Sequence, residues 1–220
     1  QQYNLPYSQD YLIDSIAKVN KNIAVILISG NAISMPWLSN VKTVLQSWYL
    51  GSEAGNAIAS IISGEVNPSG KLPFTFPKKL KDNGAHYYGE LSYPGNGETQ
   101  FYKEDILVGY RWHDTKKIKP NFAFGHGLSY ASFDLSGINS NKKTYSIADT
   151  IKISCEIKNT GTVKGSEVVQ IYVGKKNSKV KRALRELKGF KKISVLKGES
   201  KKFEIKIDVN KLAFYDEKKS

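Results

Sequence analysis

The sequence contains one cysteine, three histidines and no long apolar run, and each scarcity excludes a class of protein or site. Cys155 has no second cysteine to pair with, so no disulfide forms within the chain. The longest apolar stretch, around Ile23–Ile28, is far shorter than the ~20 residues of a membrane-spanning helix. His86, His113 and His126 are too scattered for metal-ligand spacing. We therefore expect no metal, no cofactor and no membrane partner.

Acidic residues are scarce in one half of the chain only. Residues 1–110 carry 8 Lys and Arg against 9 Asp and Glu, whereas residues 111–220 carry 25 against 11. A neutral half followed by a basic half indicates two domains and raises the hypothesis of a polyanionic partner for the second. The 13 Tyr, 9 Phe and 3 Trp exclude an intrinsically disordered chain.

The first half alternates helical and strand patterns. Apolar residues at helical spacing predict a helix over 9–19, and the continuous apolar run 24–28 predicts a strand buried on both faces of a parallel sheet. A second strand is expected within 41–48. Residues 52–63 predict another helix, with Ser52 as its N-cap. This order is typical of a layered α/β fold, here about half of one sheet.

The middle of the chain, residues 64–130, is rich in Gly, Pro, Asn and Tyr and shows little periodicity. Such a long stretch is unusual within a compact domain and typically has a binding or docking role. We predict that residues 86–130 form an extended connection between domains.

The second half shows the two-residue alternation of half-buried strands. Apolar residues alternate with charged or polar ones over 151–158 and 202–207, and a third alternating run covers 169–173. Strands at this spacing predict an all-β sandwich of the immunoglobulin or fibronectin type III kind, with a size of ~100 residues. Residues 131–220 fall just short of that size.

Several motifs together resemble one family. The C-terminal α/β domain of that family has counterparts here in residues 48–59 (WYLGSEAGNAIA), 64–77 (GEVNPSGKLPFTFP) and 102–111 (YKEDILVGYR). The segment that leads from that domain into a fibronectin type III-like domain has its counterpart in residues 124–130 (FGHGLSY). That last domain is itself resembled by 158–161 (KNTG), 165–173 (GSEVVQIYV) and 187–190 (LKGF). The order of these motifs along almost the whole chain is similar to glycoside hydrolase family 3.

This resemblance implies a retaining β-glycosidase, most often a β-glucosidase, that acts through two carboxylates. The family's nucleophile comes from an N-terminal barrel domain, and its acid/base Glu is expected just upstream of Gln1, so we predict no catalytic residue within this chain. The resemblance divides the chain into a partial α/β domain (1–85), the connection (86–130) and a fibronectin type III-like sandwich (131–220), with further strands expected after Ser220.

Two residues are weak candidates for substrate binding. Trp48 could stack on a sugar ring, and Glu53 could act as a substitute acid, although a first-turn carboxylate that suits the helix dipole is the favoured interpretation of Glu53. Packing in the core or an interface is favoured for each of the three tryptophans, and solvation for the acidic residues of the connection. Lys71 lacks the remaining residues of a phosphate loop. The residues weighed in this way are Trp37, Trp112, Glu90, Glu98, Glu104 and Asp105.

Other functions remain open at this level. The chain could be a separate carbohydrate-binding or structural module, or a basic protein that binds polyanions through the run Lys175–Arg185. The outward lysines of the strands are better explained as a solvated face, so no nucleic-acid partner is expected. The resemblance further implies a β-linked oligosaccharide or glycoside substrate bound by the full-length enzyme, the barrel domain as partner, a possible homodimer, and a periplasmic or extracellular location.

Overall fold

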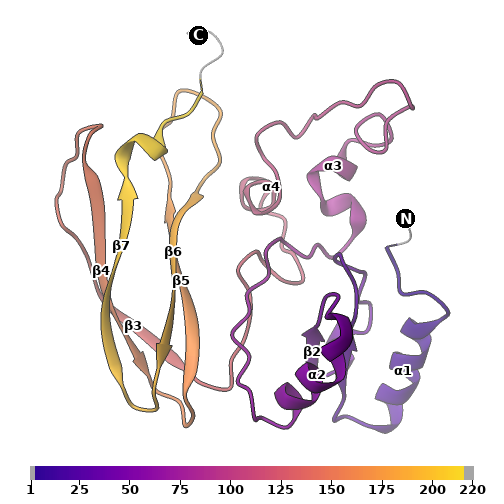
Figure 1. The fold of residues 1–220 in the computed structure, drawn as a ribbon. Coiled ribbons are helices and arrows are strands. Elements are labelled where there is room, and N and C mark those ends of the chain that lie inside the picture. The colour runs from indigo at the N-terminus through magenta and orange to yellow at the C-terminus, as the bar shows by residue number, and fades with distance from the viewer. Residues whose placement is uncertain (1–2, 216–220) are drawn as a thin grey trace. The chain divides into compact units, whose positions relative to one another are not determined.

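The structure is a computed structural model that describes residues 3–215. Within them the chain forms two compact units, and most of their α-helices and strands are labelled in Figure 1. Unit 1 comprises residues 3–65 and 72–126, and unit 2 comprises residues 66–71 and 127–215. The short segment 66–71 therefore folds with residues that follow it by more than fifty positions.

Unit 1 is a mixed α/β structure. Helix α1 spans Gln9–Val19, strand β1 Ala24–Leu27, strand β2 Thr43–Gln46 and helix α2 Ala54–Ile62. The two strands are parallel, with Ala24 opposite Thr43 and Leu27 opposite Gln46. The predicted first helix and the predicted parallel pairing are confirmed. The shorter elements of unit 1 are η1 (Leu38–Asn40), η2 (Gly51–Glu53), η3 (Leu80–Asp82), α3 (Gly84–Tyr87) and α4 (Tyr110–Lys116).

The core of unit 1 forms around buried Leu27, Met35, Trp37 and Phe76. The indole of Trp37 is fully buried, and its Nε1 donates to Asp10 Oδ1 of α1 at 2.6 Å. A buried indole N–H needs such a partner, because an unmade hydrogen bond in the interior costs free energy. This bond therefore ties the first turn of α1 to the core.

Strand β1 is less buried than its sequence predicts. Only Leu27 is buried, while Ile26 is 38 % exposed and Ile28, just after the strand, is 62 % exposed. A strand that is apolar on both faces needs a packed layer on each face. Within the described residues, unit 1 has a sheet of two strands only, and that is too small to bury both faces.

The stretch expected to be an extended connection contains α4 and contributes to unit 1. Trp112 of α4 is almost fully buried, its Nε1 donates to the Asp82 carbonyl at 3.0 Å, and Tyr87 and Tyr88 pack edge-on against its ring. A helix of seven residues completes only two turns. It is therefore too short to show a helical period in the sequence.

Unit 2 is an antiparallel sandwich of two sheets. One sheet has the order β3-β4-β7 and the other consists of β5 and β6. The alternating runs predicted as strands lie in β4, β5 and β7, so these three predictions are confirmed. The strands and the final short helix are β3 (Phe133–Ser140), β4 (Thr150–Asn159), β5 (Gly165–Val173), β6 (Glu186–Val195), β7 (Ser200–Asp208) and η4 (Val209–Leu212).

The core of unit 2 is built by apolar residues from both sheets, namely Ile157, Val169, Ile193, Val195 and Ile205. One fully buried polar side chain closes the sandwich at the end of β4. Asn159 donates from Nδ2 to the carbonyls of Val163 and Val195, at 2.9 and 3.1 Å, and accepts from the Gly161 amide. Its polar atoms are thus satisfied inside the core, as burial requires.

Candidate functional site

The carboxyl ends of β1 and β2 lie at the same edge of the parallel sheet, because the two strands run in the same direction. Ligands of open α/β sheets bind outside this edge. Ser29, Gly30 and Asn31 follow β1, and Ser47, Trp48 and Tyr49 follow β2 closely. We call these two segments, 29–31 and 47–53, the carboxyl edge. It is the candidate site of unit 1.

Hydrogen bonds from the last residue of β2 hold the first segment of the carboxyl edge. The Gln46 amide nitrogen donates to the carbonyl of Ser29 at 2.9 Å and to its hydroxyl at 3.2 Å. Tyr49, which is 77 % exposed, lies close over Gly30, where an added Cβ would stand only 2.7 Å from the tyrosine ring. The edge therefore presents an exposed phenol ring close to the Gly30 backbone.

Trp48 is held by the core. It is half-buried, and its ring packs edge-on against Phe74 and Phe76 at centroid distances of 5.5 and 6.1 Å. Its backbone has a φ of 56°, which is uncommon for a residue with a Cβ. This conformation turns the chain at the end of β2 and sends Tyr49, rather than Trp48, to the exposed surface.

Glu53 is exposed at the start of α2, and its Oε2 accepts from the Asn56 side-chain amide at 2.7 Å. Ser52 was expected to cap this helix, and that expectation is wrong. The short helix η2 over Gly51–Glu53 comes first, so that Glu53 occupies the N-cap position, where its side chain makes no capping bond to the backbone. The Glu53 carboxylate is therefore available as an acceptor for hydroxyl groups.

Two buried polar atoms lie at the end of β2. Gln46 Oε1 and Ser47 Oγ have no hydrogen-bond partner within the described part of the chain. A buried polar atom without a partner is destabilising by about 1–3 kcal/mol, and such atoms are often explained by a function or a missing partner. Neither residue was predicted from the sequence, although polar side chains that follow the apolar Val44 and Leu45 at the end of a strand are a usable signal.

The remaining aromatic and acidic candidates lie apart from this edge. Trp37 and Trp112 are core residues, and Glu90, Glu98 and Asp105 are exposed as expected. The expectation of a solvated side chain is wrong for Glu104, which is 6 % exposed and lies beside Trp112 under Gly84. No local sequence feature signals this burial.

The histidines have separate structural surroundings. His113 is buried with Nδ1 3.1 Å from the Ile118 carbonyl, and the ring of His126 lies against Phe122. His86 lies against Tyr93, and burial lowers its pKa below the usual value. Within residues 3–215, no group of three or more His, Cys, Asp or Glu could hold a metal ion, and no helix is long and apolar enough to cross a membrane.

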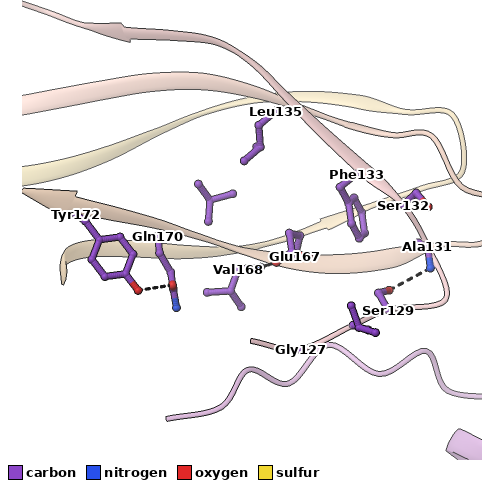
Figure 2. A pocket seen from close by; sticks show the side chains of 12 residues that line it. Gly127, Ser129, Ala131, Ser132, Phe133, Leu135, Glu167, Val168, Gln170 and Tyr172 are labelled. Carbon is purple, nitrogen blue, oxygen red and sulfur yellow. Dashed lines mark hydrogen bonds between the residues drawn. The ribbon is translucent and has the colours of Figure 1, made fainter. Parts of the chain in front are cut away.

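Unit 2 contains a hollow of about 520 Å³ beside β5, which Figure 2 shows from close by. Its acidic residue, Glu167, forms an ion pair with Lys71 at 2.7 Å, and the Tyr172 hydroxyl donates to Gln170 at 2.8 Å. Lys71, which was considered as part of a phosphate loop, is thus paired with a carboxylate of the same unit. Glu167 is the one carboxylate of this lining, and the other polar side chains are hydroxyls and an amide, which suit binding better than acid–base chemistry. The lining residues are Gly127, Leu128, Ser129, Ala131, Ser132, Phe133, Leu135, Glu167, Val168, Val169, Gln170 and Tyr172.

The family of the chain follows from comparison with known domains. Residues 1–130 match the glycosyl hydrolase family 3 C-terminal domain. The chain belongs to glycosyl hydrolase family 3. Residues 167–220 match the fibronectin type III-like domain. The predicted family and fold class, an α/β part followed by a fibronectin-like sandwich, are therefore confirmed.

The family 3 relatives are β-glucosidases. The chain is 48 % identical over 216 residues to beta-glucosidase BoGH3A of Bacteroides ovatus, covering 98 % of this chain and 29 % of the relative. It is 43 % identical to thermostable beta-glucosidase B of Acetivibrio thermocellus, with 97 % and 28 % covered. The chain thus spans less than a third of the length of these family 3 proteins.

Solved family 3 structures have the same fold. DesR, a β-glucosidase from Streptomyces venezuelae solved in complex with D-glucose, superposes with a TM-score of 0.92 at 38 % identity, covering 99 % of this chain and 27 % of DesR. A β-glucosidase from Bifidobacterium adolescentis gives a TM-score of 0.91 at 37 % identity. In each, the equivalent of this chain is part of a longer family 3 enzyme.

Proposed function

We propose that this chain is the C-terminal portion of a retaining β-glycosidase, a β-glucosidase by the activity of its relatives, which hydrolyses terminal β-linked sugars from oligosaccharides or glycosides. The observation that carries the proposal is 48 % identity to a β-glucosidase over 98 % of the chain. By family resemblance the enzyme works in the periplasm or outside the cell.

In this proposal the carboxyl edge forms one wall of the substrate cleft. The exposed Tyr49 ring and the Glu53 carboxylate supply the chemistry that sugars require, because an aromatic face packs on a pyranose and a carboxylate accepts from its hydroxyls. Gln46 and Ser47 stand behind them with polar atoms that lack partners among the described residues. The unit 2 sandwich supports the larger enzyme.

The reaction itself is assigned to residues outside this chain. Retention needs a nucleophilic carboxylate and an acid/base carboxyl about 5–5.5 Å apart on either side of the glycosidic bond. The family resemblance assigns the nucleophile to an N-terminal barrel domain and the acid/base to a position upstream of Gln1. The chain then contributes substrate contacts and support, and no step of bond cleavage.

The test is an assay of the 220-residue chain alone with an aryl β-glucoside. We expect no hydrolysis above background, because both reacting carboxylates are absent. Glu53→Gln and the matched exposed control Glu98→Gln are assayed in parallel. Turnover that Glu53→Gln abolishes and Glu98→Gln leaves intact would contradict the assignment of catalysis to residues elsewhere.

A further inference from the structure

One end of the unit 2 sandwich gathers three segments, which Figure 1 shows above the strands: the loop 141–149 between β3 and β4, the loop 174–185 between β5 and β6, and η4. Hydrogen bonds connect them. The Val209 amide donates to the Asp149 carbonyl at 3.0 Å, and the Arg182 guanidinium donates to the Leu212 carbonyl at 3.1 Å. We call these three segments the basic end.

The positive charge of the basic end is not balanced by its acidic residues. The loop 174–185 contains four lysines and two arginines and no Asp or Glu. Among the described residues, three carboxylates in or next to the basic end form ion pairs with lysines: Asp149 with Lys142 at 2.8 Å, Glu186 with Lys188 at 3.3 Å and Asp208 with Lys211 at 3.1 Å.

Four lysines of the basic end have no such partner. Within the described residues, Lys143, Lys175, Lys176 and Lys179 are exposed and take part in no ion pair or hydrogen bond of their side chains. Like charges that project from neighbouring loops produce a positive potential, which attracts polyanions. Two outer lysines of the strands differ, because Lys202 stands opposite Glu156 and Lys158 stands opposite Asp134.

Both arginines of the basic end lie over aromatic rings. The Arg182 guanidinium lies 5.0 Å over the ring of Phe214, and the Arg185 guanidinium lies 5.0 Å over that of Tyr172. Arginine forks are the side chains best suited to bind phosphodiesters in a bidentate manner. Because both guanidinium groups make these contacts, the exposed lysines supply the point charges of the basic end.

We propose that the basic end binds an acidic polysaccharide through the carboxylate or sulfate groups along its chain. Lysines on separate loops fit charges that repeat along a flexible polymer, and binding releases the counterions of that polymer. The proposal is independent of the reaction and of the carboxyl edge. It gives unit 2 a function of its own, which is to hold the protein on a charged carbohydrate.

The experiment measures binding of the 220-residue chain to polygalacturonate, which carries carboxylates, and to heparin, which adds sulfates, between 50 and 200 mM salt. The test variant combines Lys175→Glu, Lys176→Glu and Lys179→Glu. The matched control combines Lys164→Glu, Lys192→Glu and Lys197→Glu, which are exposed lysines at or near the opposite end of the sandwich. All six side chains are exposed, and equal melting temperatures check that both variants fold.

We expect salt-dependent binding to at least one polysaccharide, about tenfold weaker and less salt-dependent in the test variant and changed less than about threefold in the control. Preference for polygalacturonate or for heparin identifies the charged group. Three results would overturn the proposal: no binding at low salt, an equal loss in both variants, or tighter binding to duplex DNA or to phosphatidylglycerol vesicles than to either polysaccharide.

Discussion

The two units differ in how completely they bury their apolar side chains. In unit 2, the alternating strands place Ile157, Val195 and Ile207 inside at 0–2 % exposure. In unit 1, Leu12 of α1 is 57 % exposed and Ile28 after β1 is 62 % exposed. A half-buried strand needs one partner layer, whereas an all-apolar strand needs two. Single apolar side chains of unit 2, such as Ile138 and Phe190, are also exposed, but its two sheets enclose a packed core, whereas α1 and β1 of unit 1 leave most of their apolar residues in contact with water.

The prediction with the largest expected effect compares a buried isoleucine of unit 2 with an exposed isoleucine of unit 1. Ile157→Ala should lower the free energy of unfolding of unit 2 by about 2–5 kcal/mol, since it removes a fully buried side chain and leaves a cavity. Ile28→Ala should lower that of unit 1 by less than about 1 kcal/mol, since most of this side chain is already in water. Amide hydrogen exchange across a urea series reports each unit separately. Equal losses would contradict the difference in burial.

The difference in burial also explains which strands of unit 2 could be predicted from the sequence. The strands around Ile153, Val169 and Ile205 were found because alternation is a local signal that the finished sandwich satisfies. Strand β3 was missed because it is an edge strand with mainly exposed residues, and β6 because Gly189 and two adjacent lysines interrupt its alternation. Strand β3 lacks the pattern that one buried face imposes, and in β6 the pattern is limited to Ile193 and Val195 at the end of the strand.

The candidate site was predicted only in part, for a different reason. Glu53 was found within a family motif, but the roles of Gln46, Ser47 and Tyr49 depend on two parallel strands ending at one edge. The pairing of the two strands brings these residues together, and the spacing of the residues along the sequence does not predict that pairing. The burial of Glu104 likewise results from tertiary packing, because Glu104 lies against Gly84, which precedes it by twenty residues.

A prediction with a smaller expected effect tests whether the stability of unit 1 depends on the hydrogen bond from Trp37 to Asp10. Trp37→Phe should lower the free energy of unfolding of unit 1 by about 1.5–3 kcal/mol, because it removes the donor to the Asp10 carboxylate and leaves that oxygen partly buried. Trp48→Phe is the matched control, since this half-buried indole makes no hydrogen bond among the described residues. If the two variants lose the same stability, ring volume and not the hydrogen bond is what matters.

The smallest expected effect is a difference in pH response. In unit 1, Tyr3 donates to the Pro77 carbonyl at 2.7 Å, and burial, with a smaller contribution from Asp82, raises its pKa from 10.0 to about 12. The folded unit keeps the phenol neutral, whereas the unfolded chain ionises it near 10. The stabilisation is therefore complete below pH 10 and is lost as the pH rises toward 12.

In unit 2 the response has the opposite sign. A backbone hydrogen bond from Leu196 lowers the pKa of Glu199 below 4.5, and a hydrogen bond from Lys211 lowers that of Asp208 below 3.8. Their stabilisation is present above these values and is lost as the pH falls through the folded pKa. Hydrogen exchange should therefore show unit 1 loosening first in alkali and unit 2 first in acid. Tyr3→Phe should remove part of the alkaline loss without altering the acid response, and a change in the acid response of unit 2 would show that the two units do not titrate independently.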